Sequence, residues 1–343
     1  MAAEETHNSS FIIHNFKIKA TRRHPCYPGE RMGGTNQTVV CGGRRLALGR
    51  RTHVMGVINV TPDSFSDGGL FNSAEAAVAH GVRLLAEGAD LLDVGGESTR
   101  PGAVPVPPRE ERARVLPVVE GLVARGVRCI SVDTRNASTA AACLGAGASW
   151  INDISALRHD PAMARVARKA DGVVLMHMRG TPATMQQGEI AYDDVAREVA
   201  NFLAGRVRVA RDAGISPDRI LVDPGIGFGK TLEHNLELSR RLDVFRPLAA
   251  GIVYGPSRKG FLGKLVEEQD PRQRTAATLG AVAAGALQGA DVVRVHDVRA
   301  TVHLLRVLRS LSPQSLLKVV ASEAPARQKS PRKVEFTEVN EHF

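Results

Sequence analysis

Polar residues that close short apolar runs carry much of the chemistry that this sequence can supply. Asp133, Asn152 and Asp223 each stand at the end of such a run. A carboxylate accepts two N–H groups and a carboxamide both donates and accepts, so the three could bind the edge of a flat polar ring. One aspartate in such a turn is more often a helix N-cap. The set of three favours a binding site.

A second group of residues has the chemistry of an anion site. Arg294 and His296 are two residues apart in an apolar run, which places both side chains on one face of a strand. The planar guanidinium fork of an arginine matches phosphate oxygens. Asn59 closes another run, and its amide oxygen is a hard ligand of the kind that Mg²⁺ accepts beside waters and phosphates. Taken alone, such an asparagine is more often a turn former.

The apolar runs predict the elements that position these residues. Each run is too short for a buried helix and is followed by turn residues and then by a segment with helical period. The clearest helices are Tyr192–Ala213 and Arg274–Leu287. The eight predicted strands are Val54–Asn59, Asp90–Val94, Cys129–Val132, Trp150–Asn152, Val173–Met176, Ile220–Val222, Gly251–Tyr254 and Val292–Val295.

Eight strand–helix units predict an α/β fold, a single-domain (β/α)8 TIM barrel in which residues at the strand ends share one rim. An open, doubly wound sheet is the alternative, because periodicity does not reveal closure. Residues 52–312 form the predicted barrel domain, preceded by a short β-hairpin at 39–51 around Gly42 and Gly43. Residues 1–38 are predicted to be a poorly ordered extension, and 313–343 a flexible polar tail.

Composition restricts the class of partner. The net charge is +9, but residues 1–51 hold nine basic against three acidic side chains and so account for +6 of it. With a nearly neutral remainder and 4% aromatic residues, nucleic-acid binding is not favoured. No apolar run approaches the roughly 18 residues of a membrane span. The four cysteines form no C-x-x-C pair and the start has no secretory pattern, so we expect a cytoplasmic protein.

The order of the motifs resembles that of the dihydropteroate synthases. The segment 55–69 reads MGVINVTPDSFSDGG and the segment 95–102 reads GGESTRPG, like two signatures of that family. The Asp133 and Asn152 elements, the segment DPGIGFGK at 223–230, SRK at 257–259 and Arg294-x-His296 follow in the family's order. The resemblance covers roughly residues 52–310, and one departure is Ile226, where a phenylalanine is common.

The resemblance implies that 6-hydroxymethyl-7,8-dihydropterin pyrophosphate is joined to p-aminobenzoate with release of pyrophosphate. It also implies Mg²⁺, a homodimer, and small-molecule substrates without a nucleic-acid or membrane partner. The implied pterin-binding residues are Asp133, Asn152, Met176, Asp223 and Lys259. The implied pyrophosphate-binding residues are Asn59, which is also the metal ligand, Thr99, Arg100, Arg294 and His296. The implied p-aminobenzoate-binding residues are Phe65, Thr99, Pro101, Phe228 and Ser257.

The implied catalytic residues are Asp67, Arg100, Asp133, Lys259, Arg294 and His296. We expect a dissociative displacement at the pterin methylene, with Asp133 and Asp67 as stabilising carboxylates. No strong general base is needed, which agrees with a sequence that shows no Ser–His–Asp or Cys–His arrangement.

Four other interpretations are weaker. A nucleotide P-loop at Gly225–Thr231 would need a glycine where Pro224 stands. The single His177 between two methionines is more typical of a core or pocket wall than of a metal site. Pterin-binding methyltransferase domains share the barrel but do not need the Ser-Thr-Arg-Pro loop or Arg-x-His. A non-catalytic pterin-binding relative should have lost a motif residue, and none is missing.

Overall fold

The computed structural model describes residues 37–61, 69–100 and 102–311. The predictions for all but the last two residues of the extension, for Phe65 and Asp67, for Pro101 and for the tail therefore lie outside the described residues. No helix in the described ranges is both long and apolar enough to cross a membrane.

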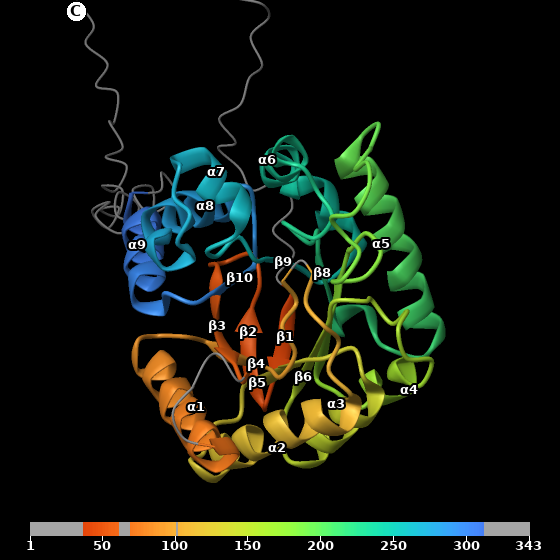
Figure 1. The fold of residues 1–343 in the computed structure, drawn as a ribbon, viewed down its shortest axis with the longest axis vertical. Coiled ribbons are helices and arrows are strands. Elements are labelled where there is room, and N and C mark those ends of the chain that lie inside the picture. Colours follow the sequence, from red (N-terminus) through yellow and green to blue (C-terminus); the bar gives the residue numbers. More distant parts are fainter. Residues whose placement is uncertain (1–36, 62–68, 101, 312–343) are drawn as a thin grey trace, which may run out of the picture. The chain divides into compact units, whose positions relative to one another are not determined.

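Eight parallel strands close into a barrel (Figure 1), because β10 pairs with β3 on one side and with β9 on the other. The (β/α)8 prediction is confirmed and the open doubly wound sheet is wrong. Each strand lies within one residue of its predicted bounds. The barrel strands are β3 (His53–Asn59), β4 (Leu91–Gly95), β5 (Ile130–Asp133), β6 (Trp150–Asp153), β7 (Gly172–Met176), β8 (Ile220–Asp223), β9 (Gly251–Tyr254) and β10 (Val292–Val295).

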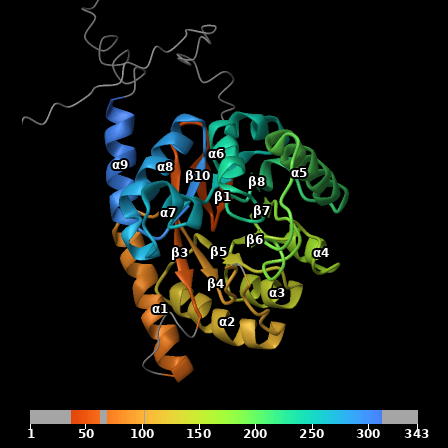
Figure 2. The same cartoon turned by 45° about the horizontal axis from the view of Figure 1, so that its top comes forward.

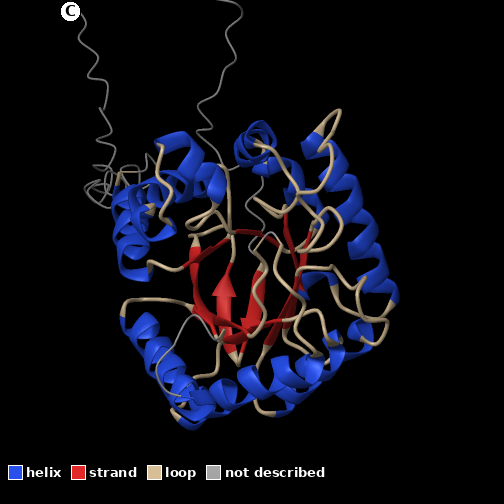
Figure 3. Cartoon of the chain, viewed as in Figure 1, coloured by secondary structure: helices blue, strands red, loops and turns tan. Residues whose placement is uncertain are grey.

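Helices surround the ring of strands (Figure 3) and cover its apolar outer face. Helix α2 begins at Pro108, and it buries Val115, Val118, Val119 and Leu122 against the barrel. The described helices are α1 (Gly69–Ala86), α2 (Pro108–Ala124), α3 (Ala137–Gly145), α4 (Met163–Ala167), α5 (Val195–Asp212), α6 (Leu232–Arg240), α7 (Gly260–Val266), α8 (Thr275–Leu287) and α9 (Val298–Ser310). Figure 2 shows α1 and α9 along the same side of the barrel.

A hairpin of β1 (Thr38–Cys41) and β2 (Arg44–Ala47) packs against the N-terminal ends of the barrel strands. Gly42 and Gly43 form its turn with φ of 57° and 79°, a conformation that costs glycine little. The indole Nε1 of the buried Trp150 donates to the Val40 carbonyl at 2.6 Å. The backbone N–H of Gly42 donates to the Asp171 carboxylate at 2.8 Å. The hairpin therefore covers one end of the barrel with bonds as well as apolar contacts.

The alternation of side chains along a strand divides the barrel interior into two zones. Near the hairpin the inward residues are apolar. They include Met55, Leu91, Trp150, Val174, Leu221, Val253 and Val292. Two residues further along the same strands, the inward residues at the other end include Asp93, Asn152, Asp223 and Arg294. The period of two thus places polar groups at the rim that faces away from the hairpin.

Candidate active site

Arg294 links the polar residues at the C-terminal rim. Its Nε donates to Asp93 Oδ2 at 2.7 Å, and its Nη2 donates to Asp133 Oδ2 at 2.8 Å. Asp93 Oδ2 also accepts from Asn152 Nδ2 at 3.0 Å. Three strands far apart in the chain, β4, β5 and β10, thus meet at one guanidinium. The other terminal nitrogen, Nη1, makes no bond within the described part of the chain, so it is free to donate to a ligand.

The charges in this group shift the pKa of Asp133. Burial raises it, the positive charge of Arg294 lowers it, and the nearby carboxylate of Asp93 raises it, leaving a pKa of about 7. For Arg294, burial disfavours the charge, but the carboxylates of Asp93 and Asp133 outweigh this and raise its pKa. Asp133 can therefore change its charge near neutral pH, whereas Arg294 keeps its charge.

Lys259 and Asp223 form a second charged group beside the first. Burial lowers the pKa of Lys259 to about 8, although the charge of Asp223 opposes the shift. Burial raises the pKa of Asp223, and Lys259 opposes that shift in turn. The Lys259 Nζ donates to the Ile226 carbonyl and lies 4.4 Å from the centroid of the Phe228 ring. An amine, a carboxylate and an aromatic face are therefore brought to the same place on the rim.

Glycines determine the conformation of the loop after β8, and hydrogen bonds hold that loop in place. At Gly225, φ is 68° and a Cβ would lie 1.8 Å from the His177 carbonyl oxygen, so a side chain cannot be accommodated. The Gly225 N–H donates to Asp223 Oδ1 at 2.7 Å. The buried Lys230 contacts His177 Nδ1 at 2.9 Å and donates to the Phe228 carbonyl at 3.0 Å. These bonds fix the segment that carries Phe228.

The contacts of Lys230 and His177 bear on the P-loop and metal-site interpretations of these residues. Lys230 is buried, and its Nζ lies 2.9 Å from the imidazole Nδ1 of His177. His177 packs edge-on against Phe202 with ring centroids 4.8 Å apart, as a core histidine would. Burial lowers the pKa of His177, and the Lys230 charge lowers it further, so the imidazole is neutral. Within the described residues no cluster of three or more His, Cys, Asp or Glu could hold a metal.

His296 follows β10 and faces the end of β9. Its Nδ1 lies 2.9 Å from the Ser257 hydroxyl, which also accepts from the His296 backbone N–H. Burial lowers the pKa of His296 to about 3, and the charges of Arg294, Arg258 and Arg100 contribute to the shift. A neutral imidazole held at Nδ1 leaves Nε2 for a ligand. The effect of Arg100 on its pKa places the loop after β4 near this histidine.

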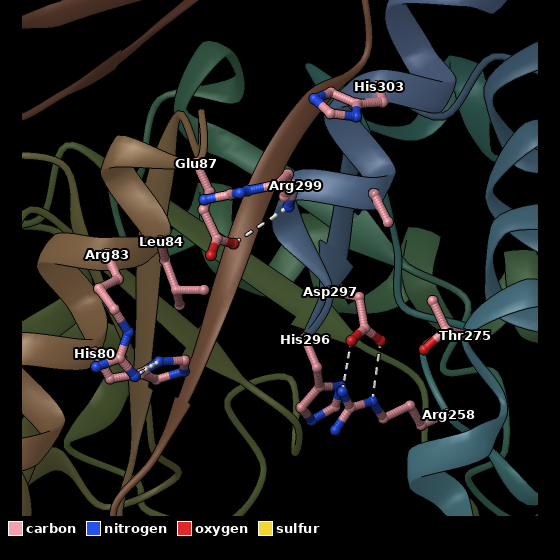
Figure 4. A pocket seen from close by; sticks show the side chains of 11 residues that line it. His80, Arg83, Leu84, Glu87, Arg258, Thr275, His296, Asp297, Arg299 and His303 are labelled. Atoms are coloured by element: carbon pink, nitrogen blue, oxygen red, sulfur yellow. Dashed lines mark hydrogen bonds and ion pairs between the residues drawn. The ribbon is translucent and has the colours of Figure 1, made fainter.

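Arg258 lies between Ser257 and Lys259 in the sequence. It has the left-handed φ of 59°, which is uncommon for a residue with a side chain. Its guanidinium forks onto Asp297, with Nε donating to Oδ2 at 3.0 Å (Figure 4). The ion pair directs the Arg258 guanidinium toward Asp297.

A groove of about 530 Å³ opens beside His296, between α1 and α9 (Figure 4). Its lining includes His296, Arg258 and Asp297, but none of the three rim carboxylates. Glu87 accepts from the Arg299 backbone N–H and so links α1 to the start of α9. The groove thus borders the candidate site on the side of His296 and does not extend over Asp133 and Asp223.

The remaining predicted residues lie at the rim or outside the described ranges. Asn59 is exposed at the end of β3, beside Gly95 of β4. Thr99 is half-buried and Arg100 exposed in the loop after β4, which the buried Glu97–Arg135 ion pair anchors at 2.8 Å. Met176 packs in an apolar cluster with Phe228, Ile154, Met178 and Met185.

An exposed amide oxygen suits a magnesium ion that takes its other ligands from water and substrate phosphates. The donor chemistry of Asn59 therefore fits the implied metal.

Asp93 is the residue that the sequence prediction missed. It is fully buried and accepts bonds from both Arg294 and Asn152. Its other oxygen, Oδ1, is buried and has no hydrogen-bond partner among the residues that the structure describes. The signal was available, because a charged residue inside an apolar strand is rare unless it has a partner. The run Asp90–Val94 predicts a strand by its length and its apolar residues, and that pattern does not single out Asp93.

The fold and this rim define a pterin-binding enzyme. The model of the "Pterin binding enzyme" family matches residues 55–296. The curated relatives include dihydropteroate synthases of Synechocystis and of Escherichia coli K12. They are 42% and 44% identical over 264 and 258 residues, which are 77% and 75% of this chain and 91% of each relative.

Solved structures agree with the curated relatives. The Xanthomonas albilineans dihydropteroate synthase with 4-aminobenzoic acid has a TM-score of 0.74 and 46% identity, covering 81% of this chain and 99% of that one. The same enzyme in complex with 7,8-dihydropteroate has a TM-score of 0.72 and 44% identity, covering 80% and 99%. The chain belongs to the dihydropteroate synthase family.

Substituting Asp93→Asn tests the importance of the missed carboxylate. The amide oxygen can still accept from Arg294 and Asn152, which both bond to Oδ2, but the substitution removes the negative charge that pairs with Arg294. It also puts an N–H₂ group at the buried Oδ1 position, which has no partner among the described residues. We expect the free energy of unfolding to fall by about 1–3 kcal/mol, and affinity for a pterin ligand to fall at least about tenfold. Denaturant titration and calorimetry measure the two effects.

The matched control is Asp243→Asn, a substitution at an exposed residue that should leave both quantities unchanged. Wild-type stability together with wild-type affinity in Asp93→Asn would show that the Asp93 carboxylate does not organise the rim.

Proposed function

We propose that this protein is a dihydropteroate synthase acting in folate biosynthesis, a transferase that moves a pterinylmethyl group from pyrophosphate to the amine of p-aminobenzoate. The observation that carries the proposal is the convergence of Asp133, Asn152, Asp223, Lys259 and Arg294 on one rim of the barrel. The solved relatives with 4-aminobenzoic acid and with 7,8-dihydropteroate support the substrate class.

The pterin ring is proposed to bind among Asp223, Asn152 and Lys259. The Asp223 carboxylate can accept two N–H groups from one edge of the ring, and Asn152 can donate and accept beside it. Lys259 can donate to the ring carbonyl or a ring nitrogen. Met176 offers an apolar contact from the cluster that also contains Phe228.

The pyrophosphate is proposed to bind between Arg294, His296 and the loop after β4. Arg294 offers its unpaired Nη1, and the neutral His296 offers Nε2. Arg100 and Thr99 reach the same place from the loop after β4. Asn59 would hold Mg²⁺, which supplies positive charge to the oxygens of the leaving group.

The p-aminobenzoate ring is proposed to lie against Phe228. Ser257 is proposed to contact the same substrate, and Lys259 can compensate the charge of the p-aminobenzoate carboxylate. Thr99 adds a hydroxyl, while Phe65 and Pro101 stay predictions because they lie outside the described residues. An aromatic wall with a cation at one end suits an aniline carboxylate.

In the proposed reaction the bond between the pterin methylene carbon and the pyrophosphate oxygen breaks first. Its electron pair leaves with pyrophosphate, and the ring spreads the positive charge of the carbon. The carboxylate of Asp133 stabilises that charge, and Asp67 is proposed to assist. The amine nitrogen then bonds to the carbon and loses one proton to water or pyrophosphate.

The proposal extends to the oligomeric state and to the cellular location of the protein. A homodimer is supported by apolar side chains exposed on α7, α8 and α9, among them Leu265, Val266, Leu287 and Val307. Sedimentation at the mass of one chain would exclude it.

A reducing cytoplasm is supported by the free thiols of the described cysteines Cys41, Cys129 and Cys143.

Incubation of the protein with the pterin pyrophosphate, p-aminobenzoate and Mg²⁺ tests the function. We expect pyrophosphate and 7,8-dihydropteroate in equal amounts. Arg294→Ala should lower turnover by roughly 100-fold or more, because the leaving group loses a fixed guanidinium. The control Arg109→Ala removes an exposed arginine of α2 and should not change the rate. Pterin binding without pyrophosphate release would identify the alternative, a non-catalytic pterin-binding paralogue.

The pH dependence of turnover tests the role of Asp133. Its pKa of about 7 means that the stabilising carboxylate is present above that pH and lost below it. We expect kcat/KM, which reports the ionisation of the ligand-free protein, to fall on acidification with an apparent pKa near 7. Asp133→Asn should remove that limb and lower the plateau at least about tenfold. The control Asp212→Asn alters an exposed carboxylate of α5. An unchanged limb in Asp133→Asn would assign the titration to another group.

Removal of the metal tests the role of Asn59. We expect a chelator to abolish turnover and added Mg²⁺ to restore it. Asn59→Ala should raise the Mg²⁺ concentration for half-maximal rate by roughly tenfold or more, because one hard oxygen ligand is lost. The exposed Asn201 of α5 provides the control Asn201→Ala. An identical Mg²⁺ requirement in Asn59→Ala would place the metal elsewhere.

A further inference from the structure

Two cysteines meet at the end of the barrel that the proposed reaction does not use. Cys41 ends β1 of the hairpin, and Cys129 lies directly before β5 of the barrel, 88 residues away in sequence. Both belong to the apolar cluster under the hairpin. They therefore join the hairpin, which packs on the barrel, to the barrel itself.

The Cys129 thiol contacts the backbone of Cys41, and the Cys41 thiol contacts a serine hydroxyl that bonds to the residues on either side of Cys129. Cys129 Sγ lies 2.9 Å from the Cys41 carbonyl oxygen. Cys41 Sγ lies 3.4 Å from the Ser149 hydroxyl. That hydroxyl in turn contacts the carbonyl of Arg128 at 3.2 Å and the N–H of Ile130 at 3.3 Å, the two neighbours of Cys129. The two sulfur atoms are therefore enclosed in one small space between β1 and β5.

The two thiols differ in access and acidity. Cys41 is fully buried, whereas Cys129 keeps 8% of its surface exposed. The pKa of Cys129 is lowered, first by a hydrogen bond with Cys41 and then, against the effect of burial, by the charge of Arg44. The pKa of Cys41 is raised, first by the same hydrogen bond and then by burial. The more acidic thiol is thus the one that solvent reaches.

We propose that Cys41 and Cys129 are a redox modification site, at which oxidation by a peroxide forms a disulfide that fastens the hairpin to the barrel. This inference stands independently of the proposed function. The Cys129 thiolate attacks the peroxide oxygen, the O–O bond breaks, and a sulfenic acid and hydroxide result; the hydroxide takes up the proton that the Cys129 thiol released and becomes one water. The Cys41 thiol then attacks that sulfur and forms the S–S bond. The hydroxyl leaves with the Cys41 proton as a second water.

The disulfide would close a loop across much of the first half of the barrel. Such a link removes conformational freedom from the unfolded chain more than from the folded one. Its place at the N-terminal end, away from the rim, predicts that stability changes while turnover does not. A dithiol would reverse the modification.

The test treats the folded, full-length protein with hydrogen peroxide and traps remaining thiols by alkylation after unfolding. We expect a mass loss of about 2 Da before alkylation, a peptide that links Cys41 to Cys129, and a Tm higher by about 5 °C or more. Turnover should stay within about twofold of the untreated protein. Dithiothreitol should restore the original mass and Tm.

Three variants sharpen the result. Cys41→Ala and Cys129→Ala should each prevent the mass loss and the rise in Tm, whereas Cys143→Ala should behave as the wild type. Cys143 is fully buried in α3, and burial raises its pKa to about 12, so it is a matched inert thiol. The linked peptide in the wild type does not depend on any variant folding.

Two outcomes would overturn the proposal. One is a peroxide-treated wild type in which Cys41 and Cys129 are both still alkylated after unfolding. The other is a linked peptide that contains Cys26 or Cys143 in place of either residue. Both are read from the same peptide map.

Discussion

The guanidinium of Arg294 between the buried carboxylate of Asp93 and the largely buried carboxylate of Asp133 is the constraint on which the rest of the site depends. Its partners Asp93 and Asp133 are 201 and 161 residues away in sequence, and they meet it because β10 closes the barrel against β3. A buried charge that loses its partners costs several kcal/mol. Closure of the barrel and pairing of these charges therefore require each other, and an open sheet would leave Arg294 on an edge without them.

The barrel interior separates this charged rim from the part that supplies stability. Below the rim, Trp150, Met55 and Leu221 pack against the hairpin in an apolar cluster, and polar contacts such as Trp150 to the Val40 carbonyl fasten the hairpin in place. A rim that holds several buried ionisable groups is expensive to fold, since each charge loses its hydration. The apolar layer and the helices around it offset that cost. The hairpin thus has a thermodynamic role even though it lies far from the chemistry.

The sequence was sufficient for the strands and for placing polar residues at the rim, because both follow from local patterns; the roles of those residues in binding stay predictions. Short apolar runs marked all eight strands, and polar residues such as Asp223 and Asn152 at their ends marked the rim. The ion pairs among the rim residues do not follow from local patterns. Arg294 was predicted as an anion ligand, and nothing local indicates that it first pairs with Asp93 and Asp133. Likewise the shifted pKa of Asp133 depends on burial and on charges from other strands, which only closure of the barrel brings together.

The pairing of Arg294 suggests how the two halves of the proposed reaction are coupled. In the ligand-free protein its charge is compensated by carboxylates, and Asp133 is held near the midpoint of its titration. A bound pyrophosphate would compete with Asp133 for the guanidinium, because phosphate oxygens carry more charge than one carboxylate. As Arg294 turned toward the leaving group, the pKa of Asp133 would rise, and the positive charge that develops on the pterin methylene would then replace the lost cation beside the carboxylate. One residue would thus favour departure of the anion and leave a carboxylate to stabilise the cation that remains.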